Sequence, residues 1–210
     1  MRCRRHFFIS GLPMDKIYEC GRKFADLLNC KYHLVVSGNR KIMKLTLDFK
    51  ETDLRHISGL HYIDDIVIEN SPSKLFTAIL KKEITDDVLK KSRKYNSKEL
   101  YEGGSIEERV SEMRFLERYL DENNFIRIYR MQEFGSKVMA DFFIESTLKD
   151  LNSTVYIFLR KRQESENYVV VSFFKKYQTY RGVNLYWMLK EKIKENDSIE
   201  LYRNQNYRYS

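Results

Sequence analysis

The sequence predicts an α+β fold, with a mostly antiparallel twisted sheet, an N-terminal helix and a helical middle insertion. Residues 31–49 and 154–174 each hold two strand-like runs, and side chains alternate in one run of each, over 43–49 and 155–160, as in half-buried antiparallel strands. Between them, residues 71–122 carry apolar side chains at helical spacing. Strands at both ends of a chain with helices between them are typical of the α+β class.

The first expected element is a helix over Pro13–Asn29. Proline suits a first helical turn, and apolar residues then recur at helical spacing. A hairpin over 31–49 follows, with Ser37-Gly38-Asn39-Arg40 as its turn. Residues 52–65 are expected to be irregular or a short helix.

The middle insertion is expected to begin with a helix over 71–82, which has a serine and a proline at its start. Gly103-Gly104 is typical of a linker. Ser105 and Glu108 then have the spacing of a capping box, and apolar residues at helical spacing predict a helix over 105–121.

The last part of the chain returns to strand patterning. We expect a strand over 125–129 and the second hairpin over 154–174. Leu185–Lys194 has helical spacing and predicts a helix, and 199–202 predicts a last strand. The polar tail, 204–210, is expected to fray.

Composition predicts one globular unit with a basic surface. Hydrophobic residues make up 42% of the chain, so we expect a single domain over 1–203 in which 71–122 is an insertion. Lys and Arg total 38 against 30 Asp and Glu, a net charge of +8. Such a surplus favours a polyanionic partner, of which nucleic acid is one kind.

Several observations predict a cytoplasmic protein with no membrane partner. No stretch approaches the roughly 20 apolar residues that a spanning helix needs. The apolar run Phe7-Phe8-Ile9 is too short for a signal peptide. The cysteines Cys3, Cys20 and Cys30 have the spacing of neither a disulfide framework nor a zinc site, so reduced thiols are expected.

The sequence lacks the common motifs of nucleotide and metal chemistry. GxxxxGK[ST], GxGxxG, HExxH and GxSxG do not occur, so no cofactor is expected. Asp64, Asp65 and Glu69 form a weak acidic cluster that lacks the pattern of a two-metal nuclease. We therefore expect no metal site.

Two of the four histidines fall in one short stretch after the first hairpin. Arg55 and His56 are adjacent, Gly59 allows a close backbone approach, and His61 follows. Histidine transfers protons near neutral pH, and a neighbouring arginine holds phosphate. A metal-free ribonuclease needs these groups, whereas the alternative is a histidine that only packs beneath its loop.

The second hairpin and the segment after it are basic and rich in tyrosine. With a loop centred near Glu164, one sheet face would carry Tyr156, Phe158, Arg160, Tyr168, Val170 and Ser172. Basic side chains grip phosphates and tyrosines stack on bases. The residues expected to contact RNA here are Arg160, Ser172, Lys175, Lys176, Tyr177 and Tyr180.

These segments resemble one nuclease family. The stretch 54–61, which follows a Lys-Leu-Thr-Leu-Asp-Phe strand, resembles a phage-associated branch of the BECR nucleases, and so do 156–160 and 171–174. That superfamily groups barnase, EndoU, the tRNA-cutting colicins and RelE. The resemblance implies a metal-independent endoribonuclease, often a toxin or phage-conflict effector, which leaves 2′,3′-cyclic phosphate ends.

The resemblance also suggests roles for single residues. His56 and Gly59 match the motif histidine and glycine, whereas Arg160 and Ser172 match by strand and face and Tyr180 by neighbourhood. His56 would be general base or acid, Ser172 would position the phosphate, and Tyr180 would donate a proton or stack on a base. Arg160 and Lys175 would hold the phosphate, and the other expected substrate contacts are Arg55, Gly59, His61, Lys176 and Tyr177.

Two alternatives stay open beside the endoribonuclease. One is a non-catalytic module that binds RNA or DNA through the basic hairpin and does not need His56. The other is an inactive nuclease-like protein that contacts a partner through its helical middle. A toxin would also have a cognate antitoxin or inhibitor as partner. A cleft shared by His56 and Arg160 would favour the enzyme.

Overall fold

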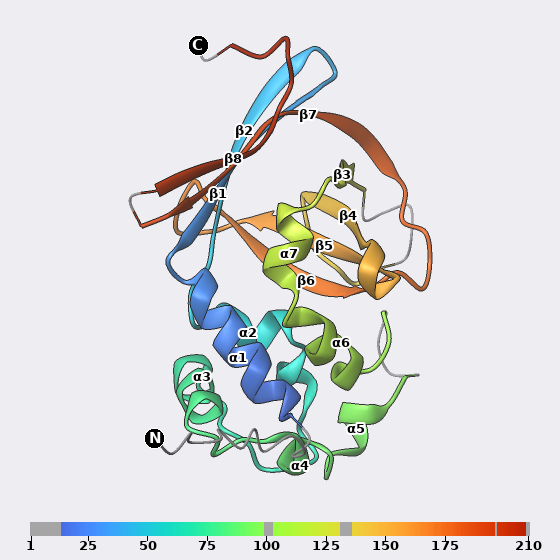
Figure 1. Cartoon of the computed structure of the whole chain (residues 1–210). Helices are drawn as coiled ribbons and strands as arrows, with labels where there is room; N and C mark the ends of the chain where they lie inside the picture. The colour runs from blue at the N-terminus through green and yellow to red at the C-terminus, as the bar shows by residue number, and fades with distance from the viewer. Residues whose placement is uncertain (1–13, 99–102, 131–135, 196, 209–210) are drawn as a thin grey trace, which may run out of the picture.

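The computed structural model describes residues 14–98, 103–130, 136–195 and 197–208. Helices gather at one end of the molecule and strands at the other (Figure 1). The fold class is the predicted α+β, with an N-terminal helix, a helical middle and a mostly antiparallel sheet.

The sheet has eight strands and closes on itself. In chain order they are β1 (Cys30–Gly38), β2 (Lys41–Asp48), β3 (Phe125–Tyr129), β4 (Phe142–Leu148), β5 (Ser153–Lys161), β6 (Tyr168–Lys175), β7 (Gly182–Lys194) and β8 (Asp197–Arg203). Their spatial order is β1-β2-β6-β5-β4-β3-β7-β8, and β1 also pairs with β7. That pairing closes seven strands into a mixed barrel, in which β2 and β6 are the one parallel pair among the described strands.

The helices of the described chain are short. They are α1 (Lys16–Leu27), α2 (Asp53–Ile57), α3 (Pro72–Leu80), α4 (Asp86–Leu89), α5 (Arg93–Asn96), α6 (Ile106–Met113) and α7 (Leu116–Asp121), with 3₁₀ turns η1 (Leu60–Tyr62) and η3 (Lys149–Leu151). Helices α2 and α6 both pack against β6. The helical middle therefore lies next to the centre of the sheet.

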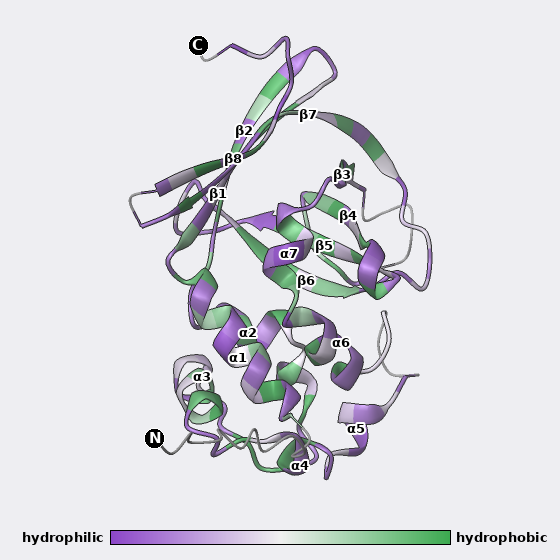
Figure 2. Ribbon diagram, viewed as in Figure 1, coloured by the Kyte–Doolittle hydropathy of each residue, from purple (hydrophilic) through white to green (hydrophobic). Residues whose placement is uncertain are grey.

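Alternating side chains of the central strands supply two separate apolar layers. Ile157 and Leu159 of β5 enter the main core, which lies between the sheet and the helices. Tyr156 and Phe158 enter an aromatic cluster with Tyr129, Phe143, Val171, Phe174 and Tyr180. Strands β4–β6 are accordingly largely green in Figure 2, whereas the helices mix both colours.

Most local predictions are confirmed. Both hairpins are present at the expected positions. The capping box of Ser105 and Glu108 is formed, and Pro72 opens α3. The first helix begins at Lys16, with Asp15 as N-cap; Pro13 lies outside the described residues. The helix predicted over 105–121 is two helices, α6 and α7, because the chain leaves the helical path at Phe115.

The helix predicted for Leu185–Lys194 is wrong, because this segment is the second part of β7. It pairs with β1 along Ser37–Cys30, and its second half also pairs with β8. Its Lys190 and Lys192 are buried and satisfied by backbone carbonyls and by carboxylates. Pairing across the barrel overrides the local helical spacing.

The predicted face of the second hairpin needs one correction. A β-bulge puts Phe158 opposite Ser172 and Leu159 opposite Val170, so Val171 is the extra residue. Val170 consequently packs in the main core, and so does Tyr168. Phe158 and Ser172 stay on the face of the aromatic cluster.

The start of the tail is packed. Tyr207, in the segment expected to fray, is buried against Val35 and Leu189. The backbone N–H of Asn204 also donates to the carbonyl of Met188. Residues 204–208 therefore extend the contact between β8 and β7.

Candidate functional site

A cleft of about 460 Å³ opens between α2, α6 and strands β5 and β6. We call it the His56 cleft, and it brings His56, Arg160 and Ser172 together. Its walls are His56, Tyr62, Arg109, Lys137, Val138, Met139, Arg160, Val171, Ser172 and Phe174. Three residues predicted from the sequence as catalytic thus share one cavity.

The backbone after α2 directs His56 toward the cleft. Helix α2 ends at Ile57, and Gly59 then takes a left-handed conformation with φ of 80°. This turn folds His61 back on His56, and the two rings stack with centroids 4.3 Å apart. One face of the exposed His56 ring is therefore covered, and the other edge is available to a substrate.

Arg109 forms the floor of the cleft. It comes from α6 and is 5% exposed, and its guanidinium lies 5.5 Å from the centroid of the Phe174 ring. A side chain at Gly59 would come 3.3 Å from the guanidinium of Arg109. The glycine therefore leaves the space that this arginine occupies.

Arg160 and Ser172 reach the cleft from neighbouring strands. Arg160 is the second residue after Phe158 on β5, and Ser172 lies opposite Phe158 on β6. Because side chains alternate along β5 and Ser172 pairs with Phe158, both side chains lie on one face of the sheet. Arg160 forms no ion pair with any carboxylate among the described residues. Its guanidinium is thus available to an anion.

The His56 cleft is strongly positive. Arg109, Lys137 and Arg160 line it, and no Asp or Glu is among its lining residues. Partial desolvation and the charges of Arg160 and Arg109 lower the pKa of His56 below 6.5. His56 is therefore neutral near pH 7 and can accept a proton.

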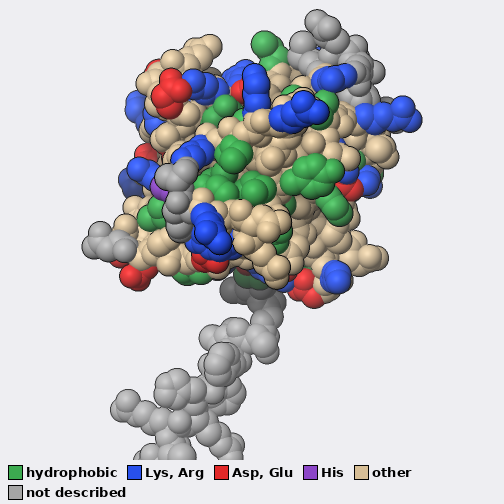
Figure 3. Space-filling model, turned by 90° about the horizontal axis from the view of Figure 1, so that it is seen from above, with side chains coloured by type: hydrophobic (Ala, Val, Ile, Leu, Met, Phe, Trp, Pro, Cys, Tyr) green, Lys and Arg blue, Asp and Glu red, His purple; other side chains and the backbone are tan. Residues whose placement is uncertain are grey.

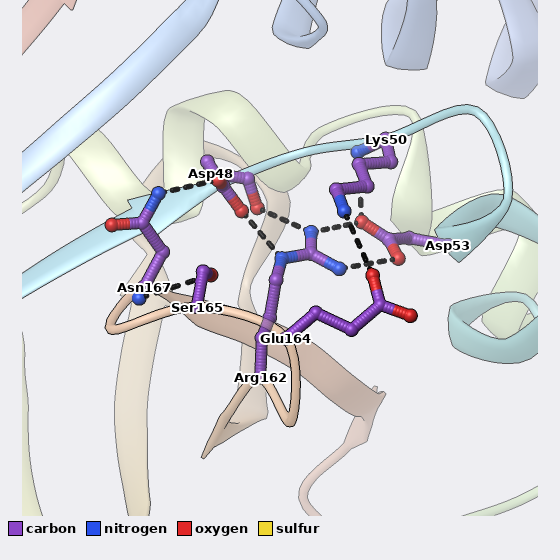
Figure 4. A network of polar contacts seen from close by, with 7 residues as sticks. All are labelled: Asp48, Lys50, Asp53, Arg162, Glu164, Ser165 and Asn167. Carbon is purple, nitrogen blue, oxygen red and sulfur yellow. Dashed lines mark hydrogen bonds and ion pairs between the residues drawn. The ribbon is translucent and has the colours of Figure 1, made fainter.

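Arg162 is two residues beyond Arg160 but is fully engaged by carboxylates (Figure 4). Its Nε donates to Asp48 at 2.6 Å, and its Nη2 donates to Asp53 at 2.5 Å. Asn167 also donates to Asp48. This network ties the end of β2 and the first turn of α2 to the β5–β6 hairpin, and so fixes the helix that carries His56.

A second cavity of about 320 Å³ adjoins the first. His56 and Arg160 line both, together with Lys50, Asp53 and Lys161 on this side. The two residues consequently stand between the two cavities. A polymer could contact both cavities while its backbone passes His56 and Arg160.

Other residues predicted from the sequence lie elsewhere. The ammonium of Lys175 pairs with Glu112 at 2.8 Å, and that of Lys176 with Glu145 at 2.5 Å. Tyr180 is 2% exposed within the aromatic cluster, where its hydroxyl accepts from Gln178. Tyr177 lines a separate pocket beside Gly103 and Gly104. None of these four predicted residues lines the His56 cleft.

The remaining predicted substrate contacts, His61, Arg55 and Gly59, lie in or beside the loop that follows α2 and are not among the lining residues of the His56 cleft. His61 places its Nδ1 3.4 Å from the carbonyl of Arg55. The Nε of Arg55 is buried without a hydrogen-bond partner. Gly59 makes room for Arg109. These residues shape the loop that holds His56.

Sequence reasoning missed Tyr62, Arg109, Lys137 and Met139. Arg109 could have been found, because it stands in the apolar stripe of its helix between Ile106 and Met113. An arginine at a position that faces the core needs a special reason to be there. Lys137 and Met139 lie in the connection between β3 and β4, for which periodicity predicted no element before Ala140.

The weak acidic cluster is occupied by protein partners. Asp64 pairs with Lys94, and Asp65 accepts from Ser92 and from the backbone of Arg93. Within the described ranges, no group of three or more His, Cys, Asp or Glu side chains is placed to hold a metal ion. In the same part of the chain, no helix combines the length and the apolar character needed to cross a membrane.

Comparison with known proteins gives one family. The model of a family described as phage-Barnase-EndoU-ColicinE5/D-RelE like nuclease 4, PBECR4, matches residues 16–206. No curated protein and no solved structure matches the chain significantly. The matched range contains every residue of the His56 cleft.

Proposed function

The chain belongs to the phage-Barnase-EndoU-ColicinE5/D-RelE like nuclease 4 family, and we propose that it is a metal-independent endoribonuclease whose active site is the His56 cleft. A nuclease family implies a nucleic-acid substrate. The observation that carries the proposal is the position of an uncharged His56 beside an unpaired Arg160, in a cleft whose described lining residues include no carboxylate.

RNA suits this set of groups because it carries its own nucleophile. The 2′-oxygen attacks the adjacent phosphorus, and its proton passes to the imidazole of His56. A bond forms between the 2′-oxygen and phosphorus, and the bond from phosphorus to the 5′-oxygen breaks. The 5′-oxygen then takes a proton, for which the hydroxyl of Tyr62, in the lining of the cleft, is the candidate donor. The product is a 2′,3′-cyclic phosphate.

The cations of the cleft would stabilise the transition state. Charge builds on the non-bridging phosphate oxygens as the fifth bond forms, and fixed guanidinium groups stabilise it. Arg160 and Arg109 are the candidates for this contact, and the hydroxyl of Ser172 would orient the phosphate between them. Lys137, at the exposed rim, would hold a neighbouring phosphate.

The biological setting is part of the same proposal. A phage-associated nuclease of this kind would act as a toxin or an effector in conflicts between phage and host. Such an enzyme needs a cognate inhibitor protein in the cell that makes it. The exposed rim of the His56 cleft, at Lys137 and Met139, is where an inhibitor would block RNA.

Product chemistry tests the proposal. Purified protein in EDTA should cut single-stranded RNA and leave 2′,3′-cyclic phosphate ends, identified by mass spectrometry. The same oligonucleotide with 2′-O-methyl groups should resist, because its nucleophile is blocked. RNA that is bound but stays intact would support the non-catalytic module, and cleavage of the 2′-O-methyl strand would rule out this mechanism.

A further inference from the structure

A further cavity, of about 560 Å³, opens at the ends of β3 and β8, where both strands lie against β7 and away from the residues of the His56 cleft. Strand β3 pairs with Gly182–Leu185 of β7, and β8 pairs with Leu189–Lys194. Tyr186, Trp187 and Met188 of β7 lie between these two pairings. We call the cavity at this position the β7 notch.

Aromatic side chains and asparagines dominate the notch. The aromatic residues are Phe125, Tyr186, Trp187 and Tyr202, and the asparagines are Asn123, Asn124, Asn184 and Asn204. Phe125 is 67% exposed and Tyr186 is 70% exposed, which is unusual for side chains of this size. Exposed aromatic rings in a hollow with amide groups offer stacking surfaces and hydrogen bonds to a flat, polar ligand.

Two basic side chains, Arg127 and Lys190, line the notch, and none of its described lining residues is acidic. Arg127 forms an ion pair with Glu145 at 2.9 Å. The ammonium of Lys190 donates to the carbonyls of Leu120 and Glu122, and it lies 4.9 Å from the centroid of the Trp187 ring. This buried ammonium therefore belongs to the floor of the notch, beneath the Trp187 ring.

The end of the molecule that β7 crosses also combines apolar and basic side chains. Figure 3 looks down on the end of the molecule over which β7 arches in Figure 1. Hydrophobic side chains gather at the centre of this face, and the charged side chains that border them are mostly Lys and Arg. An apolar surface bordered by basic residues is typical of sites that bind single-stranded nucleic acid. A site for a basic protein would instead be bordered by acidic residues.

We propose that the β7 notch binds unpaired bases of single-stranded RNA, as a second contact remote from the scissile phosphate. Phe125 and Tyr186 would stack on bases, because every base offers a π-face. The exposed Asn123 and the side-chain NH₂ of the exposed Asn184 would bond the edges of the same bases, whereas the buried Asn124 is engaged within the fold. This inference rests on the proposed function for its choice of RNA and names single strands as the substrate class.

The rigid floor of the notch suits a preformed site. The indole Nε1 of Trp187 donates to the carbonyl of Asn124 at 2.7 Å, and Asn124 in turn donates to the carbonyl of Tyr119. These bonds join β7 to the segment that leads into β3. A base can therefore enter between rings that are already in place, with little ordering cost.

Trp187 is the one tryptophan of the chain, so its fluorescence reports on the notch alone. A single-stranded oligoadenylate with 2′-O-methyl groups, which the active site would not cut, should quench this fluorescence in a saturable manner. A duplex of the same length should not, because its bases are already stacked. Absence of quenching by the single strand would overturn the inference.

Variants locate the contact. Phe125→Ala and Tyr186→Ala should each weaken binding of this oligoadenylate by about 5- to 100-fold, the worth of one base stack. Phe125→Tyr should retain the affinity, and Ile199→Ala, at an exposed apolar residue outside the notch, is the matched control. Equal affinity of Phe125→Ala and wild type would contradict the inference.

Cleavage assays separate this inference from the proposed function. Phe125→Ala and Tyr186→Ala should raise KM for long single strands and leave the cleavage rate of a dinucleotide unchanged, because a dinucleotide does not reach the notch. If both variants cleave long strands normally, the β7 notch does not bind the substrate, but the proposed active site is unaffected. If RNA quenches the Trp187 fluorescence but is never cleaved, the proposed active site is wrong, but RNA binding at the notch is supported.

Discussion

The rings of His56 and His61 stack with their planes 19° apart and their centroids 4.3 Å apart. His61 sits on the inner side, with its Nδ1 near the carbonyl of Arg55. Burial, together with the neighbouring His56, lowers the pKa of His61 to about 4. Near neutral pH both rings are therefore uncharged, which allows them to stack and makes His56 a base.

Protein stability should depend on this pair. Both imidazoles have a lower pKa in the folded chain than their ordinary 6.5, so the unfolded chain binds more protons below that pH. The free energy of unfolding should be unaffected above about pH 7 and should fall as the pH drops through about 6 to 4. Urea unfolding at a series of pH values measures it. His61→Phe, which keeps a ring, should show a weaker dependence; an unchanged dependence would contradict the buried, uncharged His61.

The rate of RNA cleavage should follow the protonation of His56. A general base must be neutral, so the rate should rise with pH, and the midpoint of this rise should lie below the ordinary histidine pKa of 6.5. Arg160→Ala removes a positive charge that lowers this pKa. The midpoint of the acidic limb should therefore move to higher pH in this variant, apart from any loss of rate. A midpoint that moves down would contradict the assignment.

The salt dependence of RNA binding should identify the residues that contact phosphate. Arg160→Ala and Lys137→Ala should each reduce the slope of log affinity against log salt by about 1, because each contact releases counterions. Lys176→Ala is the matched control, since its ammonium is engaged by Glu145. Titration of uncut 2′-O-methyl RNA at several salt concentrations gives the slopes. A loss of slope as large for Lys176→Ala would move the phosphate contacts to the second hairpin.

Gly59→Ala should damage both stability and cleavage. Its φ of 80° is strained for alanine, and the new methyl would press on the guanidinium of Arg109. We expect a loss of about 1–2 kcal/mol in urea unfolding and a lower cleavage rate. Asn152→Ala, at another left-handed position outside the cleft, should cost stability alone. Full activity of Gly59→Ala would show that the position of Arg109 does not matter.

Periodicity predicted the parts of the fold in which local pattern and tertiary contacts agree. Both hairpins and the Ser105 cap belong to this group. The pattern failed for Leu185–Lys194, where apolar residues at helical spacing belong to a long strand with partners on both edges. Such pairing depends on segments far away in the chain, and the local sequence does not contain it.

The candidate site shows the same division. His56 could be chosen from its neighbours in the sequence, and Arg160 and Ser172 from strand alternation. Arg109 lies about fifty positions from both His56 and Arg160 in the sequence. Only the packing of α6 on β6 places it beneath Gly59. Lys175 looked equally suitable, but its ion pair with Glu112 on α6 could not be foreseen.

The most direct test of the central claim is the rate of RNA cleavage by His56→Ala in EDTA. The variant should cut about 10²- to 10⁴-fold more slowly than wild type, the usual worth of a general base, and should bind uncut RNA with unchanged affinity. His33→Ala, at a histidine on β1 outside the cleft, should cut normally. If His56→Ala cuts as fast as wild type, the active site is not the His56 cleft; if wild-type protein leaves RNA intact in EDTA, the chain is not a metal-independent ribonuclease.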